Sequence, residues 1–288
     1  MPSLIDFRRR SRSVKNTQQI TKAMKMVSAA KLRRAQERVI AARPYANHLR
    51  EILENLAAAA ANDPRSSDSP WLIQREVKRI DLLFFTSDTG LAGAFNSNLF
   101  KASRKFQEDR PNAELTFITV GRKGRDFYRR RNARILSEHI NVLNRPTYQD
   151  AAGIARESIR RYKDGETDAV FVLNNEFKTV MSQKLTVSQL LPVELPPGNA
   201  ETRDYIYEQS PIEMLESLMP RFVEVAVFRA MLETVASYQA ARMTAMDTAS
   251  SNAKDVIDTL TLQMNRIRQA AITKEIIEVV SGAASAAE

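Results

Sequence analysis

Both ends of this chain lack the residues that interrupt helices. No glycine or proline occurs between Arg221 and Ser281 or between Ser3 and Arg43. At about 1.5 Å of rise per residue, the C-terminal run alone would reach roughly 90 Å as a helix. Every glycine except Gly282 lies within residues 90–198. We therefore expect two long terminal helices, with a turn-containing domain between them.

A heptad pattern follows the C-terminal run, with alternating spacings of four and three residues. Ser210, Pro211 and Glu213 match a capping box with proline at the first helical position. Because Pro220 should kink or restart a helix, we expect the main helix to begin near Arg221. The predicted seam positions are Phe222, Val225, Arg229, Leu232, Ala236, Gln239, Met243, Met246, Ser250, Ala253, Ile257, Leu260, Met264, Ile267 and Ala271.

The N-terminal run begins with a capping signal at Ser3 and Asp6. Its predicted apolar stripe changes phase near Lys31. The stripe consists of Ile20, Met24, Val27, Leu32, Ala35 and Val39. Since one helix enters the middle domain and the other leaves it, a pair formed along their lengths must be antiparallel. The C-terminal helix is the longer, so we expect an exposed apolar tip at Ile276–Val280.

The middle of the chain alternates between strand-like and helix-like segments, which is typical of a parallel α/β sheet. We predict a Rossmann-like domain, with an edge strand from the segment 176–195. The predicted strands are 79–86, 115–120 and 169–173, and the predicted helical stretches are 98–108, 124–131 and 148–162. The expected division is therefore 1–61 N-terminal helix, 62–78 linker, 79–209 α/β domain and 210–288 C-terminal helix.

The positive charge is concentrated at the start of the chain. Residues 1–43 hold twelve Lys or Arg against only Asp6 and Glu37. Such a field attracts either nucleic acid or an acidic protein surface. The chain has no cysteine, which excludes disulfides and thiolate chemistry. It also shows no membrane-spanning run or secretory signal, so we expect a cytosolic protein.

No segment carries a strong catalytic or cofactor motif. The glycines of Asp88–Gly93 and Gly121–Gly124 match neither the dinucleotide nor the P-loop pattern, which favours plain turns over phosphate sites. His48 and His139 lack partners at metal-ligand spacing. We therefore expect no catalytic residue, no cofactor and no metal, and a chain that is not itself an enzyme.

Two segments at opposite ends go beyond generic helix patterning. These are 13–27, SVKNTQQITKAMKMV, and 272–283, ITKEIIEVVSGA. Together with Ala240–Met243, Ala245–Met246, Asn252–Ala253 and the loop 87–93, they resemble the gamma subunit of bacterial F-type ATP synthases over the whole chain. The resemblance implies a long antiparallel two-helix coiled coil that acts as a rotor shaft, with an inserted Rossmann-like α/β domain.

The resemblance also implies partners and contact residues. The partners would be the alpha and beta subunits of the catalytic head, the epsilon subunit and the membrane ring of c subunits. The complex would lie at the cytoplasmic face of the bacterial inner membrane, with this chain as a peripheral subunit. The implied head-binding residues are Met24, Lys25, Arg242, Arg268, Gln269, Thr273, Glu275 and Glu278.

Three residues depart from the family pattern. Thr89, Ala92 and Ala94 stand where arginine, cysteine and glycine are common, which puts contacts of that loop in doubt. Two other classes stay open at this point. The basic N-terminal segment would suit a coiled-coil nucleic-acid binder, and the glycine-bearing loops would suit a nucleotide-binding α/β enzyme.

Overall fold

The computed structural model describes residues 4–60, 69–71, 75–193 and 209–285. It divides into two compact units, one formed by 1–28 with 243–288 and the other by 29–242. The predicted linker 62–78 falls mostly outside the described residues. Among those that are described, no helix has an apolar stretch long enough to cross a membrane.

The two terminal helices are α1, Leu4–Ala60, and α5, Pro211–Ser285. In the unit of 29–242, Arg43 contacts Glu233 and Asn47 contacts Arg229. Residue numbers therefore increase along α1 in the direction in which they decrease along α5. In the other unit, Gln18 contacts Ser250 and Lys25 contacts Asp247, which is again an antiparallel arrangement. The predicted antiparallel pair is therefore confirmed within each unit.

The helix α5 starts earlier than predicted and passes through Pro220. The amide of Glu213 donates to the hydroxyl of Ser210 at 3.4 Å, which caps the start. Pro220 has no N–H to donate to the carbonyl oxygen of Glu216, so one i→i−4 hydrogen bond is lost. Glu216 is exposed, so water can take the place of that donor. Met219, beside the proline, is buried in the core and holds the helix in place. The expected restart near Arg221 is therefore wrong.

The middle domain is a five-stranded sheet in the order β3-β2-β1-β4-β5. Four strands are parallel, and β5 pairs antiparallel with β4 at the edge, as expected for the segment 176–195. The strands are β1 Arg79–Phe85, β2 Glu114–Val120, β3 Ile135–His139, β4 Ala169–Phe177 and β5 Gln183–Leu191. The sequence patterns did not predict β3, which is short and only half-buried throughout.

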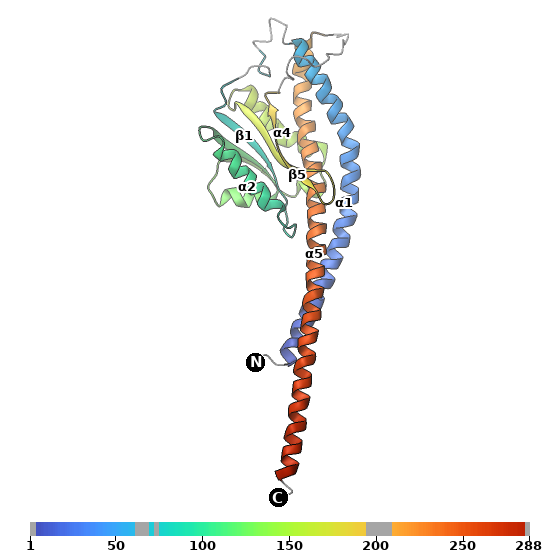
Figure 1. Ribbon diagram of the computed structural model, residues 1–288. Coiled ribbons are helices and arrows are strands. Elements are labelled where there is room, and N and C mark those ends of the chain that lie inside the picture. The colour runs from blue at the N-terminus through green and yellow to red at the C-terminus, as the bar shows by residue number, and fades with distance from the viewer. Residues whose placement is uncertain (1–3, 61–68, 72–74, 194–208, 286–288) are drawn as a thin grey trace. The chain divides into compact units, whose positions relative to one another are not determined.

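Helices cover both faces of this sheet (Figure 1). The helices α2, Phe95–Glu108, and α3, Arg122–Arg129, pack on one face around Phe84, Phe117 and Tyr128. The other face packs against α4, Tyr148–Lys163, and the parts of α1 and α5 that lie in this unit. The helix pair is thus built into the domain core, and α5 is buried on most sides between residues 222 and 240.

In the unit of 1–28 and 243–288, the seam predicted on α5 is confirmed from Met243 to Ile267, whereas its last predicted position, Ala271, is exposed. Met246, Ala253 and Leu260 are buried while most residues between them are exposed. The stripe predicted on α1 is wrong at its start, because Ile20 and Val27 are 60% and 54% exposed. The buried positions of α1 in this unit are polar instead. They are Thr21 and Ser28.

Candidate functional site

A buried carboxylate joins three elements of the middle domain. The side chain of Glu233 on α5 is 2% exposed. Arg43 of α1 donates to its two oxygens at 3.0 and 3.2 Å, and the amide of Phe177 in β4 donates at 2.9 Å. Arg43 also donates to the carbonyl oxygen of Phe177 at 2.7 Å. We call these three residues the junction, because they tie both terminal helices to the sheet.

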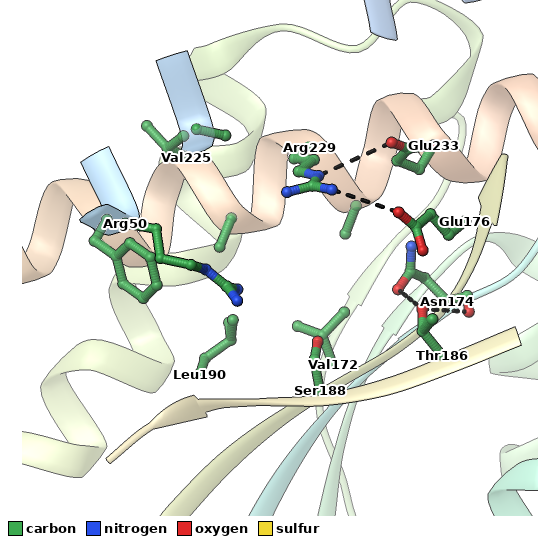
Figure 2. Close-up of a pocket in the computed structure, with 14 residues that line it drawn as sticks. Arg50, Val172, Asn174, Glu176, Thr186, Ser188, Leu190, Val225, Arg229 and Glu233 are labelled. Carbon is green, nitrogen blue, oxygen red and sulfur yellow. Dashed lines mark hydrogen bonds and ion pairs between the residues drawn. The ribbon is translucent and has the colours of Figure 1, made fainter. Parts of the chain in front are cut away.

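A cavity of about 280 Å³ adjoins the junction (Figure 2). Arg229 of α5 points into it, donating to Glu176 at 3.5 Å and to Asn47 at 3.3 Å. Lys178 pairs with Glu176 at 3.0 Å. Burial alone would raise the pKa of Glu176, but Lys178 and Arg229 outweigh it and hold that pKa below its ordinary value. Within the cavity wall, Arg229 therefore pairs with both Glu176 and Glu233, which supports the junction.

The depressed pKa of Glu176 predicts a pH dependence of stability. An acid whose pKa falls on folding stabilises the protein above its ordinary pKa of about 4.5, and the contribution is lost as the pH falls through the folded-state value. Glu176→Gln should therefore lose less stability on acidification below about pH 5 than the parent does. Urea unfolding at several pH values measures this. Glu157→Gln, which removes an exposed pair with Arg160, should keep the parent's slope.

The loop between β1 and α2 is fastened to α5 by Tyr238. Its hydroxyl bonds with the hydroxyl of Thr89 and donates to the carbonyl oxygen of Gly90 at 3.2 Å. Arg242, one of the predicted contact residues, donates to the same hydroxyl at 3.3 Å. Thr89, a departure from the family pattern, therefore has an internal role as the partner of Tyr238.

The two glycines at the start of α3, Gly121 and Gly124, allow the backbone to pack closely against Thr86. Gly121 has a φ of +102°, and a Cβ there would lie 2.3 Å from the carbonyl oxygen of Thr86. A Cβ on Gly124 would lie 2.8 Å from the Thr86 hydroxyl, which accepts the Gly124 amide proton at the same distance. These contacts support the interpretation of Gly121–Gly124 as turn chemistry.

In the unit of 1–28 and 243–288, α1 contributes polar side chains to the helix seam, whereas α5 contributes the buried Met246 and Ala253. Thr21 and Ser250 share a hydrogen bond of 2.7 Å, and Gln18 donates to the carbonyl oxygen of Ser250 at 3.4 Å. Lys25, a predicted contact residue, pairs with Asp247 at 2.6 Å. The positive charge of Lys25 is thus shared with a neighbour in the same unit.

On its outer side, the same part of α1 exposes apolar side chains. Ile20, Met26 and Val27 are each more than half exposed, and Met24 is half-buried. Contiguous apolar exposure of this kind is typical of a contact surface. Basic side chains such as Lys22 lie close to these apolar residues along α1.

The described side chains of α5 from Arg268 to Ser281 are exposed. Arg268, Gln269, Thr273 and Glu275 all lie on this segment, and the hydroxyl of Thr273 donates back to the carbonyl oxygen of Gln269 at 2.9 Å. The side chain of Glu278 lies outside the described residues. The predicted apolar tip is confirmed as exposed, at 58–71% for the residues Ile276, Ile277, Val279 and Val280.

The structure therefore gathers most predicted contact residues in one unit. Met24 and Lys25 lie on α1, and the residues from 268 to 275 lie on α5. Arg242 is the last residue of the other unit. Within the described part of the chain, no group of three or more His, Cys, Asp or Glu side chains is arranged to hold a metal.

Sequence comparisons match nearly the whole chain. A family model described as ATP synthase matches residues 3–286. The ATP synthase gamma chain of Solibacter usitatus (strain Ellin6076) is 58% identical over 99% of this chain and 100% of its own length. The gamma chain of Geobacter sp. (strain M21) is 49% identical, with 99% of each chain covered.

Solved structures give the same picture of the fold. The central stalk and c-ring structure of the Tetrahymena thermophila mitochondrial ATP synthase contains a chain that is 25% identical, with a TM-score of 0.64. The match covers 80% of this chain and 99% of that one. A chain of the Euglena gracilis mitochondrial ATP synthase rotor is 20% identical, with a TM-score of 0.70 and coverage of 93% and 98%.

Proposed function

Because this chain belongs to the ATP synthase gamma family, whose match spans residues 3–286, we propose that it is the rotating shaft of the central stalk. In this role it couples ion flow through the membrane sector to ATP synthesis or hydrolysis in the alpha and beta subunits. The proposed mechanical role rests on α5, which is an unbroken helix of 75 residues and contributes to both compact units. The family match gives no support to the nucleic-acid-binding alternative.

A shaft catalyses no reaction. It acts because its contacts differ from one catalytic subunit to the next. An asymmetric surface favours different conformations in otherwise equivalent catalytic subunits, and rotation passes those conformations from one subunit to the next. The proposal therefore assigns no catalytic residue and no cofactor to this chain. The division into 1–61, 62–78, 79–209 and 210–288 follows the same proposal, with the outer segments as the shaft.

The head contacts proposed for the shaft are surface residues of the two helices. The exposed apolar side of α1 around Met24 would meet the beta subunits, together with Lys25. The exposed segment of α5 would bear the remaining contacts. These are Arg268, Gln269, Thr273, Glu275 and Glu278. Arg242, at the end of the other unit, would act on a related surface beside the Tyr238 contact.

The remaining partners are proposed on the same basis. The epsilon subunit and the ring of c subunits would hold the α/β domain, since the Tetrahymena thermophila match is a central stalk determined with its c-ring. The chain would then be a peripheral subunit at the cytoplasmic face of the bacterial inner membrane. It would reach the membrane through the ring.

Reconstitution tests this function directly. The purified chain should show no ATPase activity alone, and it should confer ATP-driven ion pumping when combined with separately made alpha, beta and epsilon subunits and stripped membranes. Pumping is measured by quenching of a pH-sensitive dye. A chain that hydrolyses ATP alone, or that supports ATPase without pumping, would contradict the proposal.

Met24→Glu should weaken coupling. The substitution places a carboxylate on the apolar side of α1, within the basic segment 1–43 for which we propose an acidic partner surface, and like charges repel. We expect fewer ions pumped per ATP hydrolysed, with hydrolysis itself retained. Met24→Leu is the matched control and should pump as the parent does. Equal pumping per ATP in the Met24→Glu variant and the parent would contradict the electrostatic explanation.

A further inference from the structure

A second and larger cavity lies in the unit of 29–242, with a volume of about 700 Å³. Its walls come from α1, from α5, from the loop that follows β1 and from the loop that precedes α4. In the strand order β3-β2-β1-β4-β5, the chain builds β2 and β3 on one side of β1 and then crosses to β4 on the other side. Ligands of open α/β sheets bind at such a point, outside the carboxyl ends of the strands. We call it the switch-point cavity.

Four cationic side chains line the switch-point cavity. Lys31, Arg34 and Arg38 lie on one side of α1, and Arg145 comes from the loop before α4. None of the four has a hydrogen-bond or ion-pair partner among the described residues. Like charges around one cavity repel each other unless an anion offsets them.

The two acids in the wall offset these four cations only in part. Asp88 accepts the backbone amides of Arg122 and Asn141 at 3.0 and 3.1 Å. Glu37 lies 3.5 Å from Arg33, which does not line the cavity. The cavity therefore carries an excess of positive charge.

The wall beside the cations is apolar. Leu143, Leu232 and Val235 line it, from the segment before α4 and from α5. An apolar wall beside a group of cations suits a molecule that joins an anionic group to a ring.

We propose that the switch-point cavity binds a phosphorylated small molecule of nucleotide size. The phosphates would lie against Arg34, Arg38 and Arg145, and a ring would lie on the apolar wall. The volume is within the range of small-molecule sites, about 300–1,000 Å³. An acidic peptide would satisfy the cations but would place no ring against the apolar wall.

Binding to the full-length chain tests this proposal, without the alpha and beta subunits because they bind nucleotide themselves. Isothermal titration with ADP, pyrophosphate and adenosine separates the contributions of ring and phosphate. We expect one saturable site for ADP, weaker binding of pyrophosphate and the weakest binding of adenosine. The double variant Arg34→Gln/Arg145→Gln should weaken ADP binding by about tenfold or more.

Arg33→Gln provides the control for the Arg34 half of that variant. It removes one positive charge at the neighbouring position, from a side chain that is 85% exposed and outside the cavity, so ADP binding should be unchanged. Equal weakening by Arg33→Gln and by the double variant would show attraction to a basic surface and overturn the proposal. Absence of ADP binding, or displacement of ADP by a polyglutamate peptide at lower concentration than by pyrophosphate, would also overturn it.

Discussion

Glu233→Ala is expected to lower the free energy of unfolding by about 2–4 kcal/mol. The substitution leaves the buried amide of Phe177 without its acceptor and leaves Arg43 without its carboxylate. The Arg43 side chain is 32% exposed and can reach water, which keeps the expected loss below that of a fully buried pair. Guanidinium unfolding of the full chain, followed by circular dichroism, measures the loss.

Two variants separate the junction from a general effect of charge. Glu233→Gln keeps one acceptor oxygen at nearly the same shape, so its loss should be smaller than that of Glu233→Ala. Glu37→Ala, which removes an exposed acid of α1, should change stability by less than about 0.5 kcal/mol. If Glu233→Ala were no more harmful than Glu37→Ala, the junction would not hold the helices to the sheet.

The junction also gives a physical reason why the two helices and the sheet should turn together under load. Under the proposed function, torque passes from the α/β domain into the helix pair. Apolar packing resists separation but allows side chains to slide, whereas the hydrogen bonds of Glu233 fix both helices against one strand at defined positions. The destabilised Glu233→Ala variant should therefore also transmit torque less faithfully.

The sequence was sufficient to predict the helix pair and most of the sheet, because those elements follow from simple rules. A long run without breakers allows a helix, a heptad pattern places its seam, and chain connectivity makes the pair antiparallel. The segments around β1, β2 and β4 are strongly apolar, as strands covered on both faces must be. The strand β3 is half-buried and gives no such signal.

The error on α1 has a different cause. Apolar residues usually mark the buried side of a helix, yet Ile20 and Val27 are exposed and Thr21 is buried. A seam of hydrogen bonds around Ser250 replaces apolar packing there. A surface that contacts other subunits can be apolar without belonging to the chain's own core. Sequence pattern alone does not distinguish these two kinds of apolar stripe.

The junction and the Tyr238 contact could not be predicted for a related reason. Glu233 lies beside the seam position Leu232 and resembles an ordinary helix surface residue in sequence. It is buried because the sheet covers that side of α5, and its partners Arg43 and Phe177 are distant in the chain. The available signal was one of the two carboxylates, Glu224 and Glu233, within the largely apolar segment 222–240, and it is weak without the fold.

Gly121→Ala is expected to cost about 3 kcal/mol or more in stability, for two independent reasons. The φ of +102° strains any residue with a Cβ. That Cβ would also lie 2.3 Å from the backbone oxygen of Thr86, which cannot move away without breaking the end of β1. The Thr86 amide donates to the carbonyl oxygen of Val120 at 2.8 Å, so a displaced Thr86 would also disturb the pairing with β2.

Gly153→Ala provides a control with the opposite expected sign. Gly153 lies inside α4, and nothing is within 4 Å of the position that its Cβ would take. Alanine should therefore stabilise the helix by about 0.5–1 kcal/mol, because glycine loses more conformational freedom on folding. Thermal unfolding of both variants measures the contrast. A Gly121→Ala variant as stable as the parent would mean that the turn after β2 has room for a side chain, and that its glycines are kept for some reason other than packing.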